Sequence, residues 1–542
     1  MTKKNTPLSI FNHFSKFNKM KIKNLIICAL VALSITSCQK FDELSVNPNA
    51  PTSATASLIF TKVCADMYGA VQGPWGDPHK YAQMWCLNYE YYGNQNYNWT
   101  TTGLSFGTLN DIKQMEAGAV LNGGDPKLNP YAALGKFFRA YLYVNMTQRV
   151  GDLPLTEALN ADNNIFKPKY DSQKAVYIQV LKWLEEANSD LQSLQEKANK
   201  SLSGDIYYGN DLKKWQKAVN SYRLRVLISL SKKEADADLS IKTKFAAIVN
   251  DLAKNPIFTS TADNLNYVYN NVYNKYPTNP DNYGFDATRQ NMAETFVKTL
   301  TDIKDPRVFR TCEPADSLLR KGFTPSSFEA YVGANSGESL ADMATKANND
   351  LYSFINRYRY YQGYTAEPYS LIGYVEQCFN IAEAINRGWV TGNAEDLYKA
   401  GINASIASFD IKTGTNTGYY LKKGVILGTF TPYTFTTNLD DYYAQTAVKY
   451  AGNNATGLNQ ILTQKYLGFF QQSGWEAFYN QRRTGVPTFR VGPGNTNGQK
   501  IPKRWQYPTS ERTNNADNWK AALTNQFGNT NDDINADLWI LK

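Results

Sequence analysis

Apolar residues recur at helical spacing along most of this 542-residue chain, and the alternation typical of strands is scarce. Over residues 130–149 the apolar positions lie three or four apart, which places them on one helix face. That face consists of Leu134, Phe137, Phe138, Tyr141 and Leu142. The same spacing predicts a helix over 53–71, capped by Thr52 or Ser53, with an inward stripe of Leu58, Ile59, Val63 and Met67. The chain is therefore predicted to be all-α.

Further helices follow the same pattern. One begins at Ser172 and turns inward Val176, Val180, Leu184, Ala187 and Leu191. Others are predicted at 211–232, 241–253, 290–302, 370–386, 394–409 and 457–480. The pairs within 172–232 and 370–409 favour tetratricopeptide-like helical hairpins, although no strict 34-residue repeat is visible. We predict a single domain over residues 38–542.

Long stretches rich in Asn, Gly, Pro and Tyr separate the predicted helices. They cover residues 73–110, 260–290, 411–440 and 485–535. Loops of this length inside a compact protein are usually functional or disordered. Their aromatic content favours ordered, irregular loops that face a ligand.

The N-terminus has the pattern of a bacterial lipoprotein signal. Residues 1–37 carry six lysines and no acidic residue, and they include an apolar run of about 11 residues, Leu25–Ile35. A membrane-spanning helix needs roughly 20 residues, so this run predicts export rather than anchoring. Cys38 follows the small residues that precede a lipobox cysteine, which predicts a lipidated N-terminus at Cys38. Met20 is an alternative start of the same signal.

Charge and cysteine content narrow the class of protein further. Removal of the six signal lysines takes the formal charge from +9 to about +3, which argues against nucleic acid as a partner. After the signal and Cys38 are set aside, four cysteines remain, with no CxxC spacing. A disulfide such as Cys64–Cys86 and buried free thiols are both compatible with this pattern.

Enzymatic chemistry has little support, because His79 is the only histidine after residue 37. Ser105 lies in a GxSxG pattern, but no histidine follows it to complete a triad. Glu376 and Glu383 lie seven residues apart on a predicted helix, a spacing that could suit an inverting glycosidase. Two helix residues that bond to their neighbours explain this spacing more simply. We therefore predict no catalytic residues, no metal site and no cofactor.

Several blocks spread along the chain resemble the SusD/RagB family of Bacteroidetes nutrient-binding outer-membrane lipoproteins. A prominent one is the Gly-Asp-x-Pro-x-x-Glu-Ala stretch over 151–158. The other blocks include Lys214-Trp215, Arg223-Leu224-Arg225, Asp305-Pro306-Arg307, Tyr374-Val375-Glu376, Ala382-Glu383-Ala384 and Arg482-Arg483. Each block alone is unspecific, and together they identify the resemblance. Most of them are expected to be structural, with Arg482 and Arg483 fixing loops through carboxylates.

The resemblance implies a cell-surface lipoprotein of the outer membrane that is lipid-anchored and works with a SusC-like TonB-dependent transporter. Its ligand would be a nutrient, most commonly a glycan and in some members a peptide. Alternative interpretations are a surface glycan-degrading enzyme and an adhesion or scaffold protein that binds other proteins. The family's binding residues vary, so no ligand contact follows from the motifs.

Aromatic side chains among short amides mark the candidate ligand site. In residues 75–99 they include Trp75, Tyr91, Tyr92, Tyr97 and Trp99. Aromatic faces stack on the C–H faces of sugars, and amides bond to sugar hydroxyls. Tyr81, Trp85 and Tyr89 recur at the spacing of a helix face, which favours core over ligand. An opposite wall is predicted in a second loop, at Tyr283, Phe285 and Arg289.

Overall fold

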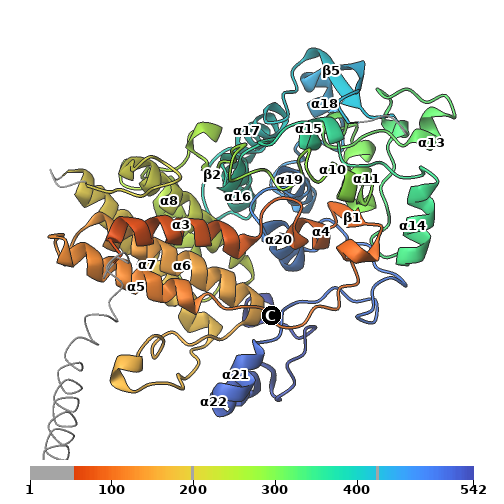
Figure 1. Cartoon of the computed structure of the whole chain (residues 1–542). Helices are drawn as coiled ribbons and strands as arrows, with labels where there is room; N and C mark the ends of the chain where they lie inside the picture. Colours follow the sequence, from red (N-terminus) through yellow and green to blue (C-terminus); the bar gives the residue numbers. More distant parts are fainter. Residues whose placement is uncertain (1–53, 197–200, 423–426) are drawn as a thin grey trace, which may run out of the picture. The chain divides into compact units, whose positions relative to one another are not determined.

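The computed structural model describes residues 54–196, 201–422 and 427–542. Residues Thr55 to Lys542 form one compact unit (Figure 1). The predicted signal peptide, 1–37, and the predicted lipidation site, Cys38, lie outside the described residues and stay predictions. None of the helices in the three described ranges combines the length and apolar character needed to cross a membrane.

The first half of the unit is a set of packed helices. In Figure 1, α3, α5, α6, α7 and α8 lie together, and each of these helices contacts the next one along the chain. The bounds of these helices and of the neighbouring α9 are α3 Ala56–Val71, α5 Phe106–Leu121, α6 Pro130–Val150, α7 Gln173–Gln195, α8 Leu212–Ser229 and α9 Ile241–Val249. Side chains cap four of these helices: Thr55, Asn129, Ser172 and Asp211 accept from backbone amides at the starts of α3, α6, α7 and α8. The predicted all-α fold of helical hairpins is confirmed, with α7 and α8 forming one pair.

The predicted inward faces of α6 and α7 are confirmed, because every apolar residue assigned to them is buried. The prediction for α3 is partly wrong. Leu58 is 60% exposed, and Phe60 and Cys64 fill the core beside Val63 and Met67. The cap is Thr55, whose hydroxyl accepts from the Leu58 amide, so the helix begins later than predicted.

A second hairpin contains α16, Tyr374–Asn386, and α17, Ala394–Ala407, with α19, Ala455–Gly468, packed against both. The sequence predicted one helix over 457–480, which is wrong. Gln471, Ser473 and Gly474 adopt positive φ angles of 55°, 59° and 58° and break the helix. The chain resumes as α20, Glu476–Thr484, and this break turns Glu476 toward the interior.

Three short antiparallel strand pairs replace parts of the predicted loops. They are β1, Trp85–Leu87, with β3, Gln290–Met292; β2, Leu265–Tyr267, with β4, Tyr369–Ile372; and β5, Gly414–Tyr420, with β6, Thr431–Thr437. The β1–β3 pair joins the two stretches that carry the predicted ligand site. It also shortens the helix predicted over 290–302 to α11, Glu294–Asp302.

Nine further α-helices of the described residues, inside and between the predicted loops, were missed; seven of them have only four to six residues, too few for a detectable periodicity. The remaining α-helices are α4 Asp77–Tyr81, α10 Tyr283–Asp286, α12 Val308–Thr311, α13 Asp316–Leu319, α14 Leu340–Asn348, α15 Arg357–Tyr361, α18 Leu439–Ala444, α21 Thr509–Asn514 and α22 Ala516–Phe527. The four cysteines of the described residues, Cys64, Cys86, Cys312 and Cys378, are buried free thiols. The alternative of a Cys64–Cys86 disulfide is therefore wrong.

Candidate functional site

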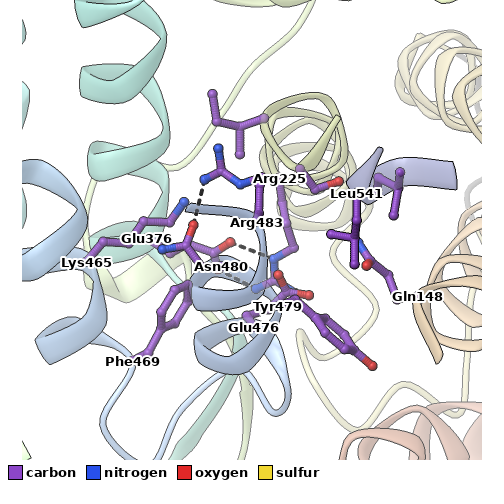
Figure 2. Close-up of a pocket in the computed structure, with 13 residues that line it drawn as sticks. Gln148, Arg225, Glu376, Lys465, Phe469, Glu476, Tyr479, Asn480, Arg483 and Leu541 are labelled. Atoms are coloured by element: carbon purple, nitrogen blue, oxygen red, sulfur yellow. Dashed lines mark hydrogen bonds and ion pairs between the residues drawn. The ribbon is translucent and has the colours of Figure 1, made fainter. Parts of the chain in front are cut away.

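Charged residues converge inside the protein, most of them from the family-like blocks (Figure 2). We call Arg225, Glu376, Glu383, Lys465, Glu476 and Arg483 the ionic hub. Arg225 of α8 donates from Nε to Glu376 of α16 over 2.7 Å. Arg483 of α20 donates from Nη2 to Glu383 of α16 over 2.9 Å, and Lys465 Nζ of α19 lies 3.6 Å from the same carboxylate. Helices distant in sequence are thus held together by charge-assisted hydrogen bonds.

This arrangement decides between the two interpretations of Glu376 and Glu383. Each carboxylate is bound by an arginine and buried, at 5% and 0% exposure, so neither is available as a glycosidase carboxylate. The expected structural role of Arg483 is confirmed. Arg482 instead donates to the backbone oxygen of Gln148 over 2.9 Å, so the expectation of a carboxylate partner there is wrong.

The hub encloses a cavity of about 20 Å³, which holds at most a water molecule and no nutrient. Burial raises the pKa of Glu476, which lines this cavity, to about 7. Burial lowers the pKa of Lys465 to about 8, although the negative charge of Glu383 acts to raise it. Burial also disfavours the charged form of Glu383, but Arg483, Lys465 and Arg387 outweigh it and hold the pKa of Glu383 well below its usual range.

A different kind of surface is formed by Tyr89, Tyr91 and Tyr92, which with Arg289 make up what we call the tyrosine patch. The centroids of the Tyr91 and Tyr92 rings lie 5.1 Å apart at 86°, and those of Tyr89 and Tyr92 lie 5.9 Å apart. The Arg289 guanidinium lies 4.4 Å from the centroid of the Tyr89 ring. Tyr91 is 83% exposed and Tyr89 46% exposed, so the patch presents aromatic faces to solvent.

The patch borders a pocket of about 250 Å³, which we call the arginine pocket because Arg289 belongs to both. The pocket is lined by Tyr283, Thr288, Arg289, Asp316, Ala347, Asn348, Asp350, Phe354, Arg357, Leu421 and Lys422. Arg357 is held by Glu313, to which its Nε donates over 2.9 Å. The pocket therefore combines an aromatic rim with convergent hydrogen-bonding groups.

Backbone pairing brings the two predicted walls together. The Asn88 amide donates to the Arg289 carbonyl over 3.0 Å, and the Asn88 side chain donates to the Thr288 carbonyl over 3.1 Å. Phe285, 67% exposed, lies on α10 two residues after Tyr283 of the pocket. The sequence missed Tyr89, which it assigned to a helix face, and it missed the pocket residues from α13, α14 and the segment at 421–422. No sequence pattern connects those distant segments.

Two predicted ligand residues lie in the core instead. Tyr97 is 0% exposed; its hydroxyl donates to the Tyr81 carbonyl and accepts from Gln83. Trp75 is 6% exposed, and its Nε1 donates to Tyr276 over 3.1 Å. Neither ring presents a face to a ligand, because both side chains are buried. Their polar atoms are bonded within the protein.

Trp99, also predicted as a ligand residue, belongs to another concavity. Its ring stacks on Trp505, with centroids 4.4 Å apart and an interplanar angle of 3°. Both line a cleft of about 580 Å³ that we call the threonine cleft, after Thr100, Thr101 and Thr102. The threonine cleft shares no lining residue with the arginine pocket.

The residues considered for catalysis are not arranged for it. His79 is 0% exposed, neither of its ring nitrogens has a partner among the described residues, and burial lowers its pKa to about 3. Ser105 precedes α5 as its N-cap residue and contributes no side-chain bond there, without the preceding strand of a nucleophile elbow. Across the described ranges, no group of three or more His, Cys, Asp and Glu side chains is placed to hold a metal ion.

Comparisons with known proteins place this architecture in a family. Residues 48–508 match the SusD-like_2 family, described as "Starch-binding associating with outer membrane". A SusD homologue from Bacteroides fragilis is 30% identical with a TM-score of 0.77, over 90% of this chain and 100% of its own. A Bacteroides vulgatus protein, provisionally assigned to the outer membrane and to nutrient binding, is 32% identical with a TM-score of 0.74 over the same shares.

A chitin-binding SusD homologue from Flavobacterium johnsoniae shares the fold, with a TM-score of 0.66 and 19% identity over 90% of this chain and 98% of its own. A comparison with curated protein sequences finds no match. The fold is that of the SusD homologues. The chain belongs to the SusD-like family, which confirms the resemblance seen in its sequence.

Proposed function

We propose that this protein is a lipoprotein of the outer-membrane surface that binds a nutrient glycan and delivers it to a SusC-like TonB-dependent transporter. The observation that carries the proposal is the tyrosine patch with its exposed aromatic rings. Arg289 of this patch also lines the arginine pocket. Aromatic faces and convergent polar groups match the C–H faces and hydroxyls of sugars. Tyr91, Tyr92, Tyr283, Phe285 and Arg289 are the proposed ligand contacts.

The proposed role is binding rather than catalysis. Glu376 and Glu383 are each bound by an arginine, and His79 is buried without a nucleophile partner. Related proteins named for nutrient binding support the same role for this chain. A purified sample should therefore leave a bound glycan chemically unchanged. Turnover that a carboxylate variant abolishes would favour the alternative of a surface glycan-degrading enzyme.

The ligand class is tested with a glycan and peptide array, followed by calorimetry on the purified protein. Arg289→Ala should weaken binding of the selected glycan at least tenfold, because Arg289 joins the patch to the pocket. Arg512→Ala, on an exposed arginine of α21 that belongs to neither the patch nor the pocket, is the matched control. Selection of peptides alone would assign the protein to peptide uptake.

Anchoring and partnership are tested separately. Cys38→Ala should abolish incorporation of labelled fatty acid and release the protein from membranes. Protease treatment of intact cells should degrade the anchored protein, as expected for surface exposure. Co-purification with a large β-barrel protein would support the proposed transporter, whereas its absence under gentle extraction would favour an adhesion or scaffold role.

A further inference from the structure

The threonine cleft is a large concavity that has so far been given no role. Its lining comes from the end of α3, from α4 and from residues 98–105, and it includes the three tryptophans Trp99, Trp475 and Trp505. Its volume of about 580 Å³ falls within the range of small-molecule binding sites. It differs from the ionic hub, whose cavity has room for one water molecule at most.

Hydrogen bonds hold the walls of the cleft in place. Trp99 Nε1 donates to the Arg504 carbonyl over 2.8 Å, which fixes the ring stacked on Trp505. The Gln506 amide donates to the Thr100 carbonyl, and the Thr102 amide donates to the Gln506 carbonyl, over 3.1 and 3.2 Å. The cleft is therefore preformed, so a ligand would not have to order its walls.

The polar side chains of the cleft remain available for a ligand. Five of them make no side-chain hydrogen bond to any other described residue: Gln72, Asn98, Thr100, Thr101 and Ser105. Amides supply donors and acceptors, and a hydroxyl can act as either. Sugar hydroxyls have the same dual character, so this lining suits a polyhydroxylated ligand.

The two charged residues that line the cleft, Asp77 and Arg149, make bonds within the protein. Arg149 donates from Nη1 to Thr102 Oγ1 over 3.2 Å and from Nη2 to the Ala70 carbonyl over 2.7 Å. The Asp77 carboxylate lies 2.7 Å from Lys80 Nζ. All the other lining residues are neutral, which favours an uncharged ligand over an ionic one.

Two half-buried rings give the cleft an apolar edge. The Tyr81 and Trp99 rings stand at 87° with centroids 4.9 Å apart, and both line the cleft. Aromatic surface beside free hydroxyls and amides is complementary to a sugar ring. We propose that the threonine cleft is a second binding site, which takes a neutral saccharide of a few rings independently of the arginine pocket.

Tryptophan fluorescence tests this site directly, since three tryptophans line the cleft and none lines the arginine pocket. The purified protein is titrated with maltotriose, cellotriose, xylotriose, mannotriose and N,N′,N″-triacetylchitotriose. At least one should produce a saturable change in emission. The double variant Asn98→Ala/Thr101→Ala should weaken that titration at least tenfold with an unchanged thermal melt, because neither side chain bonds to the protein.

Two variants separate this site from the proposed glycan site. Arg289→Ala should leave the fluorescence titration unchanged, and the exposed Thr530→Ala serves as a control that touches neither site. A signal lost in Arg289→Ala but kept in the double variant would overturn the second site while supporting the first. No emission change with any of the five saccharides would also overturn it.

Discussion

The ionic hub and the tyrosine patch use similar residue types for opposite purposes. In the hub, Arg225 and Arg483 are almost fully buried and each is bound to a glutamate. In the patch, Arg289 lies over the Tyr89 ring and also lines the arginine pocket. Residues that match the family's blocks form the hub, whereas the patch lies outside them. The difference indicates that the family-like blocks of this chain build its interior rather than its exposed aromatic surface.

The largest effect is expected from breaking the hub at Glu383. Glu383→Gln would leave Arg483 and Lys465 buried without their carboxylate, a change that typically costs about 3–5 kcal/mol of unfolding free energy. Chemical denaturation measures this loss. Asp302→Asn is the matched control: it breaks the exposed Lys298–Asp302 pair and should cost under about 1 kcal/mol. Equal losses in the two variants would contradict a special role for the hub.

A second pair of variants contrasts the patch with the core. Tyr92→Ala should weaken glycan binding by at least about 2 kcal/mol, roughly thirtyfold, because a stacking surface is removed. Tyr97→Phe should leave affinity unchanged and cost about 1 kcal/mol of stability, because the hydrogen bonds of a buried hydroxyl are lost. Calorimetry and thermal melts on both variants separate the two effects. Unchanged affinity in Tyr92→Ala and Tyr91→Ala would move the ligand site elsewhere.

The sequence predicted the helices better than the site. The faces of α6 and α7 follow directly from apolar spacing, since long amphipathic helices carry many repeats of the same signal. Tyr97 and Trp75 were misplaced because aromatic content alone does not distinguish a polar-bonded core ring from an exposed one. The pairing of β1 with β3, which joins Tyr89 to Arg289, involves three residues in each strand and leaves no periodic signal. The break before α20 depends on positive φ angles at Gln471 and Ser473. Glutamine and serine do not predict a positive φ, so the break could not be found from the sequence.

The smallest expected effect concerns the protonation of Glu476. Its folded-state pKa, raised by burial to about 7, exceeds the ordinary value of 4.5, so the folded protein binds more protons than the unfolded chain between these values. This contribution to stability is therefore complete below about pH 4.5 and is lost as the pH rises through 7. Glu476→Gln removes the titration, so its stability relative to the wild type should rise by roughly 2 kcal/mol between pH 5 and pH 7.5.

The window of pH 5 to 7.5 isolates Glu476 from its neighbours in the hub. The lowered pKa of Lys465, about 8, affects stability mainly above that window, where stability should rise with pH because the unfolded chain binds more protons. Glu329 is a control of opposite sign: its hydrogen bond from Ser327 lowers its pKa below 4.5, so the difference between Glu329→Gln and wild type should stay constant from pH 5 to 7.5. Denaturation curves at four pH values measure both variants. A Glu476→Gln difference that is equally constant would show that Glu476 remains ionised in the folded protein, and the hub would then contain a fully charged network.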